Sequence, residues 1–200
     1  MKKICVFCGS SFGNNKSYSD TANLLGKLIA KKNIELVYGG ASVGLMGEIA
    51  SAVINAGGKV IGVIPKQLIE KEVAHTGLND LRVVGSMSER KSLMADLSDG
   101  FIALPGGFGT LEEVFEVVAW GQLNFHNKPL GLLNVNGYYD NLISFLDHTV
   151  KENFIKPEHR EMILVDSDPE KMLLKLQNYI PPKFDKADWI LEMLNKQKPA

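Results

Sequence analysis

The sequence predicts an α/β fold in which a doubly wound parallel sheet carries helices on both faces. Short, continuously apolar segments such as 60–64 alternate with longer segments in which apolar residues recur at helical spacing. The apolar runs lack polar alternation, which suits a parallel sheet that helices cover on both sides. Glycine-rich loops follow three of these runs, as expected at the carboxyl ends of such strands. These features indicate a single Rossmann-like domain.

Strands and helices are expected to alternate regularly. We expect strands at residues 3–8, 34–38, 59–64, 81–84, 100–104, 130–134 and 163–165. We expect helices at residues 17–31, 44–56, 86–98, 110–123, 138–152 and 169–178. Two consecutive prolines, Pro181 and Pro182, end the alternation. Residues 1–180 are therefore predicted to form the Rossmann-like domain, and residues 181–200 an amphipathic helical appendage.

Composition excludes several classes of function. The 200 residues are 45% hydrophobic and 22% charged, with a net charge of −1, so no basic surface for nucleic acid is expected. No apolar run approaches the roughly 20 residues that span a membrane. The N-terminus passes from two lysines into a strand without a signal-peptide pattern, so we expect a cytoplasmic protein.

Metal and disulfide chemistry are not expected. Cys5 and Cys8 have C-x-x-C spacing but fall on a predicted strand, where positions three apart face opposite sides. No second Cys or His pair completes a zinc site, so both are expected to be reduced structural thiols. The histidines are dispersed, at positions 75, 126, 148 and 159.

The segment 105–113, Pro-Gly-Gly-Phe-Gly-Thr-Leu-Glu-Glu, joins a strand to a helix through a loop with few side chains. Its glycines, Gly106, Gly107 and Gly109, would let backbone N–H groups approach an anion, and the helix beginning near Thr110 would direct its positive end there. A structural alternative is a capping box, because Thr110 and Glu113 have T-x-x-E spacing.

The helix at 110–123 carries apolar residues on two sides. One side is expected to face the core, and its members are Leu111, Val114, Phe115, Val118 and Gln122. Val117, Trp120 and Glu113 lie opposite, which indicates a second buried face with Glu113 at its end. We expect this face to form a homodimer interface near the active site.

A basic pair interrupts the apolar stripe of the helix at 86–98. Met87, Arg90, Lys91 and Met94 occupy positions i, i+3, i+4 and i+7. Long basic side chains can extend to water from such positions. Because this helix begins at the edge where the glycine loops gather, we favour an arginine that faces a bound phosphate.

Spacing excludes two kinds of phosphate ligand. Leu45 and Met46 stand where a triphosphate-binding loop has Lys and Ser or Thr. Glu112 stands where the dinucleotide motif has its third glycine, and this loop follows a late strand. A smaller anion remains, such as a nucleoside monophosphate or a sugar phosphate.

The segment 105–113, with Arg90 and Lys91 upstream, resembles the signature of the LOG ("lonely guy") family of cytokinin riboside 5′-monophosphate phosphoribohydrolases, long mislabelled as lysine decarboxylases. The similarity extends over about residues 4–165, including the segments 8–11, 38–41, 44–47, 64–66 and 133–139. The resemblance implies a homodimer with a Rossmann-like fold. It also implies hydrolysis of the N-glycosidic bond of adenosine-type 5′-monophosphates to free base and ribose 5-phosphate.

The resemblance also implies roles for individual residues. Arg90 and Glu113 match the catalytic pair. Substrate contacts are expected, from the family positions and from the glycine loops, at Glu72, Arg90, Lys91, Gly106, Gly107, Gly109, Thr110, Ser10 and Gly40. No cofactor or metal is expected. Ala119 departs from the plant pattern of a hydroxyl residue there, which leaves open whether the base is prenylated or plain adenine.

Two alternatives remain. A non-catalytic nucleotide or cofactor carrier could use the same fold, because fold does not fix function. A lysine decarboxylase would need pyridoxal phosphate or another electron sink, and Lys91 is the one lysine near the inferred site. A carboxylate at Glu113 favours the hydrolase, because a carrier has no obvious use for a negative charge beside a phosphate.

Overall fold

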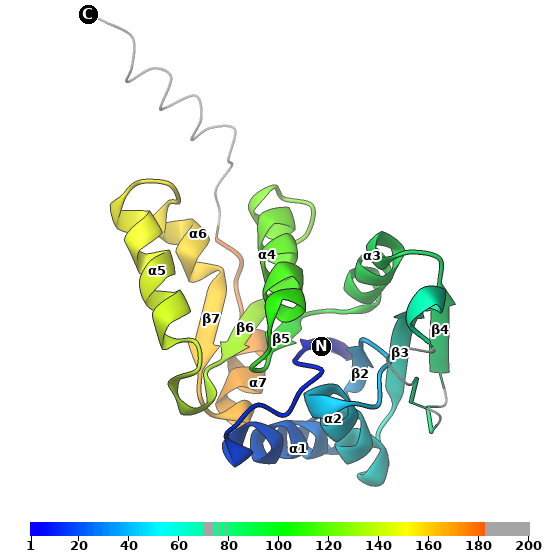
Figure 1. Ribbon diagram of the computed structural model, residues 1–200. Coiled ribbons are helices and arrows are strands. Elements are labelled where there is room, and N and C mark those ends of the chain that lie inside the picture. Colours follow the sequence, from blue (N-terminus) through cyan, green and yellow to red (C-terminus); the bar gives the residue numbers. More distant parts are fainter. Residues whose placement is uncertain (70–73, 76, 79, 183–200) are drawn as a thin grey trace, which may run out of the picture.

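A seven-stranded, entirely parallel sheet forms the centre of the molecule (Figure 1). The computed structural model describes residues 1–69, 74–75, 77–78 and 80–182. The strand order is β4-β3-β2-β1-β5-β6-β7. The strands are β1 (Lys3–Phe7), β2 (Glu35–Tyr38), β3 (Val60–Pro65), β4 (Asp80–Val84), β5 (Phe101–Ala103), β6 (Leu130–Leu133) and β7 (Ile163–Asp166). The predicted doubly wound α/β fold is confirmed, and no strand end differs from its predicted position by more than one residue.

Helices cover both faces of this sheet. One layer contains α1 (Lys16–Lys31), α2 (Gly44–Asn55) and α7 (Pro169–Gln177). The other contains α3 (Met87–Leu97), α4 (Phe108–Gln122), α5 (Asp140–Lys151) and α6 (Pro157–Glu161). Three short helices were not predicted, namely α6 and the 3-10 turns at Lys66–Leu68 and Val135–Gly137, because so few residues show no helical periodicity.

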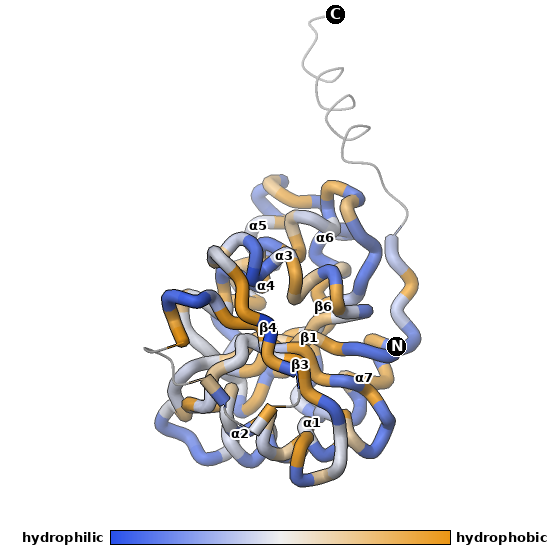
Figure 2. Tube along the Cα trace, turned by 90° about the vertical axis from the view of Figure 1, so that its right-hand side faces the viewer, coloured by the Kyte–Doolittle hydropathy of each residue, from blue (hydrophilic) through white to orange (hydrophobic). Residues whose placement is uncertain are grey.

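The strands carry the hydrophobic core. Figure 2 shows apolar residues concentrated on the central strands, with hydrophilic residues on the surrounding helices and loops. Separate clusters of buried side chains lie on the two faces of the sheet. Cys5 belongs to one cluster and Cys8 to the other, and both are free thiols, which confirms the prediction from strand alternation.

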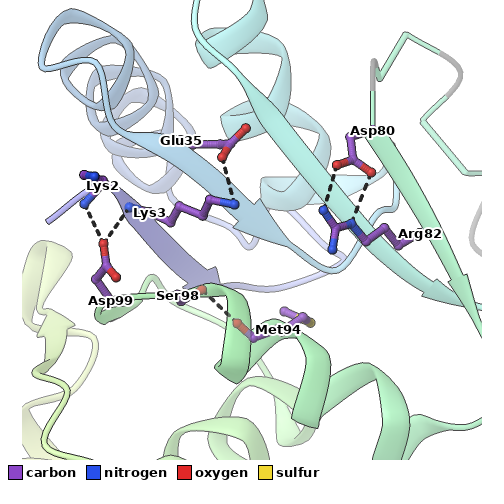
Figure 3. A network of polar contacts seen from close by, with 8 residues as sticks. All are labelled: Lys2, Lys3, Glu35, Asp80, Arg82, Met94, Ser98 and Asp99. Atoms are coloured by element: carbon purple, nitrogen blue, oxygen red, sulfur yellow. Dashed lines mark hydrogen bonds and ion pairs between the residues drawn. The ribbon is translucent and has the colours of Figure 1, made fainter.

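The amino edge of the sheet carries charged residues that pair with one another (Figure 3). Asp99 accepts a hydrogen bond from the backbone N–H of Lys3 at 3.0 Å, and Lys3 in turn forms an ion pair with Glu35 at 3.2 Å. Asp80 and Arg82 pair at the start of β4. These charges are satisfied by one another and leave no free group for a ligand among the pairs named here.

The chain reverses its winding direction at β1, which lies between β2 and β5. The loops that follow β1 and β5 therefore meet at a switch point, where doubly wound folds bind ligands. They touch directly, since the N–H of Gly9 donates to the carbonyl of Pro105 at 3.1 Å. No helix in the described ranges is long and apolar enough to span a membrane. Residues 183–200 lie outside the described part, so the C-terminal appendage remains a prediction.

Candidate active site

Helix α4 begins at the switch point with an open first turn. Gly107 is its N-cap residue, with no side-chain cap and no acidic residue in the first turn. The helix thus starts two residues before the position expected from Thr110. The capping-box alternative is wrong, because Thr110 lies inside the first turn, buried, and Glu113 lies within the helix. The first N–H groups of α4 are left for a ligand.

The glycines of this loop serve two different purposes. A Cβ at Gly106 would lie 2.1 Å from Oγ1 of Thr110, so this glycine is required by close packing. At Gly107 and Gly109 a Cβ would meet nothing within 4 Å. Their missing side chains therefore leave open space in front of the helix, as an approaching anion requires.

Arg90 is buried at the start of α3 and is held by two backbone carbonyls. Its Nε donates to the carbonyl of Val63 at 3.1 Å, and its Nη2 donates to that of Gly39 at 3.0 Å. A Cβ at Gly39 would lie 2.0 Å from Nη2, so the guanidinium needs glycine there. These bonds fix a positive charge at the carboxyl ends of β2 and β3, with the rest of the guanidinium lining a pocket.

Glu113 faces the same pocket from α4. Burial raises the pKa of its carboxyl to about 7, although the nearby Arg90 charge opposes the rise; Glu112 adds a smaller increase. A carboxyl whose surroundings bring its pKa close to neutral pH is a candidate for a catalytic role. Burial also raises the pKa of the Cys8 thiol, which therefore stays protonated and is not a nucleophile.

The pocket has a volume of about 230 Å³ and brings most of the predicted residues together. It is lined by Cys8, Gly9, Ser10, Met46, Met87, Arg90, Gly107, Phe108, Gly109, Thr110, Glu112 and Glu113. Sequence reasoning did not propose Met46 and Met87 as site residues, because methionines on helical stripes have no spacing signal distinct from core packing.

Other predicted contacts lie outside this pocket. Gly40, with φ of +82°, packs against Ile64, and its carbonyl accepts from the N–H of His75 at 3.1 Å. The Lys91 ammonium pairs with Glu112 and with Glu116, in the second case at 3.0 Å. Gly106 lines a neighbouring hollow. Glu72 falls outside the described residues.

Helix α4 packs against the core with most of the predicted stripe, since Val114 is buried and Leu111 and Val118 pack against the same core cluster. Its buried residues are Thr110, Val114, Val117 and Gly121, whereas Phe115 is 39% exposed. Val117 is buried within this chain, and Trp120 packs against the same core cluster, so the expectation that they form an uncovered face is wrong. Apolar residues lie on several sides of this helix, so periodicity alone did not predict that Val117 is buried within the chain and Phe115 exposed.

No group of three or more His, Cys, Asp or Glu side chains in the described part of the chain is placed to hold a metal ion. The site instead offers an open helix N-terminus, a fixed guanidinium and a carboxyl with a raised pKa, gathered at the switch point of a Rossmann-like sheet. These features are typical of an α/β enzyme that binds a phosphorylated small molecule.

Comparison with known proteins narrows this class to one family. Residues 46–176 match the family described as "Possible lysine decarboxylase". The chain is 50% identical over 196 residues to a cytokinin riboside 5′-monophosphate phosphoribohydrolase of Arabidopsis thaliana, covering 96% of this chain and 92% of that one. It is 49% identical over 180 residues to one of Oryza sativa subsp. japonica, covering 90% and 74%. The chain belongs to the LOG family of cytokinin riboside 5′-monophosphate phosphoribohydrolases.

Solved structures share the fold at lower identity. The molybdenum cofactor carrier protein of Chlamydomonas reinhardtii superposes with a TM-score of 0.67 and 25% identity, covering 88% of this chain and 96% of that one. The molybdenum cofactor binding protein of Rippkaea orientalis gives 0.68 and 24%, with the same coverage. These neighbours support the Rossmann-like fold.

Proposed function

We propose that this protein hydrolyses the N-glycosidic bond of adenosine-type 5′-monophosphates, releasing the free base and ribose 5-phosphate. The observation that carries the proposal is one pocket that joins Glu113 and Arg90 to the open N-terminus of α4. Family relatives named for this activity support it. Both cytokinin riboside monophosphate and AMP are candidate substrates, because Ala119 departs from the plant pattern.

The phosphate anchors the substrate in this proposal. N–H groups at the start of α4 would bind it, with Gly107 and Gly109 leaving the space it needs. Ser10 lines the same pocket from the loop after β1 and would add a hydroxyl donor. The phosphate stays attached to the ribose throughout, so its binding energy positions C1′ and takes no part in bond breaking.

Glu113 would act on the sugar. Cleavage of the C1′–N9 bond develops positive charge on the ribose, which an ionised carboxylate stabilises. Water supplies the oxygen that bonds to C1′ and the proton that the departing base requires, so the reaction balances without a cofactor. The guanidinium of Arg90 is fixed by the carbonyls of Val63 and Gly39. From there it would either neutralise the charge of the phosphate or hold Glu113 in its orientation.

The test is release of free base. The protein is incubated with AMP and with isopentenyladenosine monophosphate, and separately with the nucleosides that lack phosphate, and the products are separated by chromatography. We expect free base from the monophosphates and little from the nucleosides. Equal turnover of nucleoside and nucleotide would remove the phosphate-anchoring argument.

The carrier alternative makes the opposite prediction, because a carrier binds nucleotide and returns it unchanged. The sequence is about 50% identical to hydrolases but only 25% identical to a carrier, and this difference favours the hydrolase. The decarboxylase alternative is weaker still. The ammonium of Lys91 is occupied by two carboxylates and does not line the pocket, so it is poorly placed to form a Schiff base.

We further propose that the protein acts as a homodimer through the outer side of α4. Phe115 is exposed there, and Phe108 is 93% exposed at the pocket mouth. A second copy would cover both and place the site near the subunit boundary. Phe115→Glu should shift the mass in light scattering from about twice 22.0 kDa toward 22.0 kDa. A wild-type protein that is monomeric and fully active would contradict this.

We also propose that the protein acts in the cytoplasm, because its buried free thiols suit a reducing compartment.

A further inference from the structure

A second hollow lies directly beside the candidate active site. It has a volume of about 310 Å³, and Gly9, Ser10 and Gly107 line both spaces. Gly106 and Tyr138 line only the second hollow. The peptide between Gly106 and Gly107 therefore stands at the partition between the two, with a different environment on each side.

Tyr138 holds this partition from the far side. Its hydroxyl donates a hydrogen bond to the carbonyl of Gly106 at 2.6 Å. Its ring makes edge-on contacts with Tyr18, at 5.6 Å between ring centres, and with Tyr139, at 5.0 Å. The Tyr139 hydroxyl donates to the carbonyl of Leu104 at 2.7 Å, so two adjacent tyrosines brace the loop after β5.

The planarity of the peptide carries this contact into the active site. In a trans peptide the C=O and the following N–H point in opposite directions, and the described chain contains no cis bond. With the Gly106 carbonyl drawn toward Tyr138, the N–H of Gly107 points away from that carbonyl, and Gly107 also lines the pocket with Glu113. This N–H has no acceptor within the residues that the structure describes. Two consecutive glycines rotate easily, so this orientation needs an external hold.

We propose that Tyr138 is a positioning residue, whose hydroxyl orients the Gly106–Gly107 peptide so that the Gly107 N–H binds the substrate phosphate. The inference rests on the proposed function for the identity of the anion. The phenol lines the second hollow and not the pocket with Glu113, so it would act on the phosphate only through the Gly107 N–H. Its effect is therefore confined to the part of the ligand that carries the phosphate.

The test compares Tyr138→Phe with Tyr18→Phe, measuring ribose 5-phosphate and adenine binding by calorimetry. Tyr138→Phe removes only the hydroxyl that holds Gly106, and Tyr18→Phe removes a hydroxyl from the same hollow without touching Gly106. Tyr138→Phe should weaken ribose 5-phosphate binding about fivefold to tenfold, the scale of one hydrogen bond, with adenine binding unchanged. In base-release assays its KM should rise more than its kcat falls. Tyr18→Phe should behave as wild type.

Unchanged ribose 5-phosphate binding in Tyr138→Phe, or an equal loss of adenine binding, would overturn the inference, as would a wild type that binds no ribose 5-phosphate. A wild type that binds it but releases no base refutes the proposed function alone. A measurement on the wild type guards against a variant that fails to fold. On titration with inorganic phosphate, the amide proton of Gly107 should shift downfield in NMR spectra more than that of Gly106. No such shift would also overturn the inference.

Discussion

Helices α3 and α4 both begin at the carboxyl edge of the sheet, but their first turns are completed in opposite ways. The Ser86 hydroxyl accepts from the N–H of Glu89 at 3.1 Å, and the Glu89 carboxylate accepts from the N–H of Gly85 at 2.7 Å. The start of α3 is therefore closed by its own side chains. Helix α4 has Gly107 as its cap and no side chain in that role. The start of α3 has no free capping position for a ligand, whereas the start of α4 is free to bind one.

The largest effect on turnover should come from Glu113, whose carboxyl lies beside the open start of α4. Glu113→Gln keeps the shape of the side chain but removes the charge proposed to stabilise the transition state, so turnover should fall by a factor of about 100 or more. Base release under saturating nucleotide measures this. Glu112→Gln is the matched control, because it lies one position away and its partner is Lys91. A similar loss in both variants would show that charge in this region, and not Glu113, is responsible.

The same substitution should change the pH dependence of stability. Glu113 has a pKa of about 7 in the folded protein against 4.5 ordinarily, so between these values the folded state holds a proton that the unfolded state has lost. The wild-type free energy of unfolding should therefore fall as pH rises through this window, while base release rises as the carboxylate forms. In urea titrations, Glu113→Gln should match wild type near pH 4 and be more stable by about 3 kcal/mol at pH 8.5. A stability gap independent of pH would contradict the assignment.

The sequence predicted the fold well because the apolar runs and the glycine loops are local signals. It also placed Arg90 and Glu113 in one site, since parallel strands bring their following loops to one edge. For α4 it correctly placed Val114 in the core, but it did not predict that Val117 is buried within this chain. Val117 and Phe115 are both apolar, and only packing against the sheet decides that the first is buried and the second exposed. The two carbonyls that hold Arg90, from Val63 and Gly39, are backbone atoms and leave no residue-type signal.

The start of α4 also permits a test in which stability and affinity change in opposite directions. An alanine Cβ at Gly109 meets nothing within 4 Å, so Gly109→Ala should raise stability by about 0.5 kcal/mol through helix propensity. The same methyl would occupy the space proposed for the phosphate, so KM for the nucleotide should rise about tenfold. Thermal melting and base-release kinetics measure the two effects.

Gly39→Ala provides the contrast for that variant. Its Cβ would lie 2.0 Å from Nη2 of Arg90, so stability and turnover should both fall. If Gly109→Ala binds nucleotide as tightly as wild type does, the phosphate must bind elsewhere.

The smallest effect on turnover should come from the capped start of α3. Ser86→Ala removes the cap of α3 and should cost about 1 kcal/mol in the free energy of unfolding, measured by urea titration. Turnover should stay within about twofold of wild type, because the bonds from Arg90 to Val63 and Gly39 hold the guanidinium independently of the cap. Asn15→Ala, which removes the equivalent cap of α1, is the control for a loss of stability at a residue that does not line the pocket. If Ser86→Ala loses turnover as severely as Glu113→Gln while Asn15→Ala does not, the cap itself sets the position of Arg90, and the closed end of α3 contributes to catalysis as directly as the open end of α4.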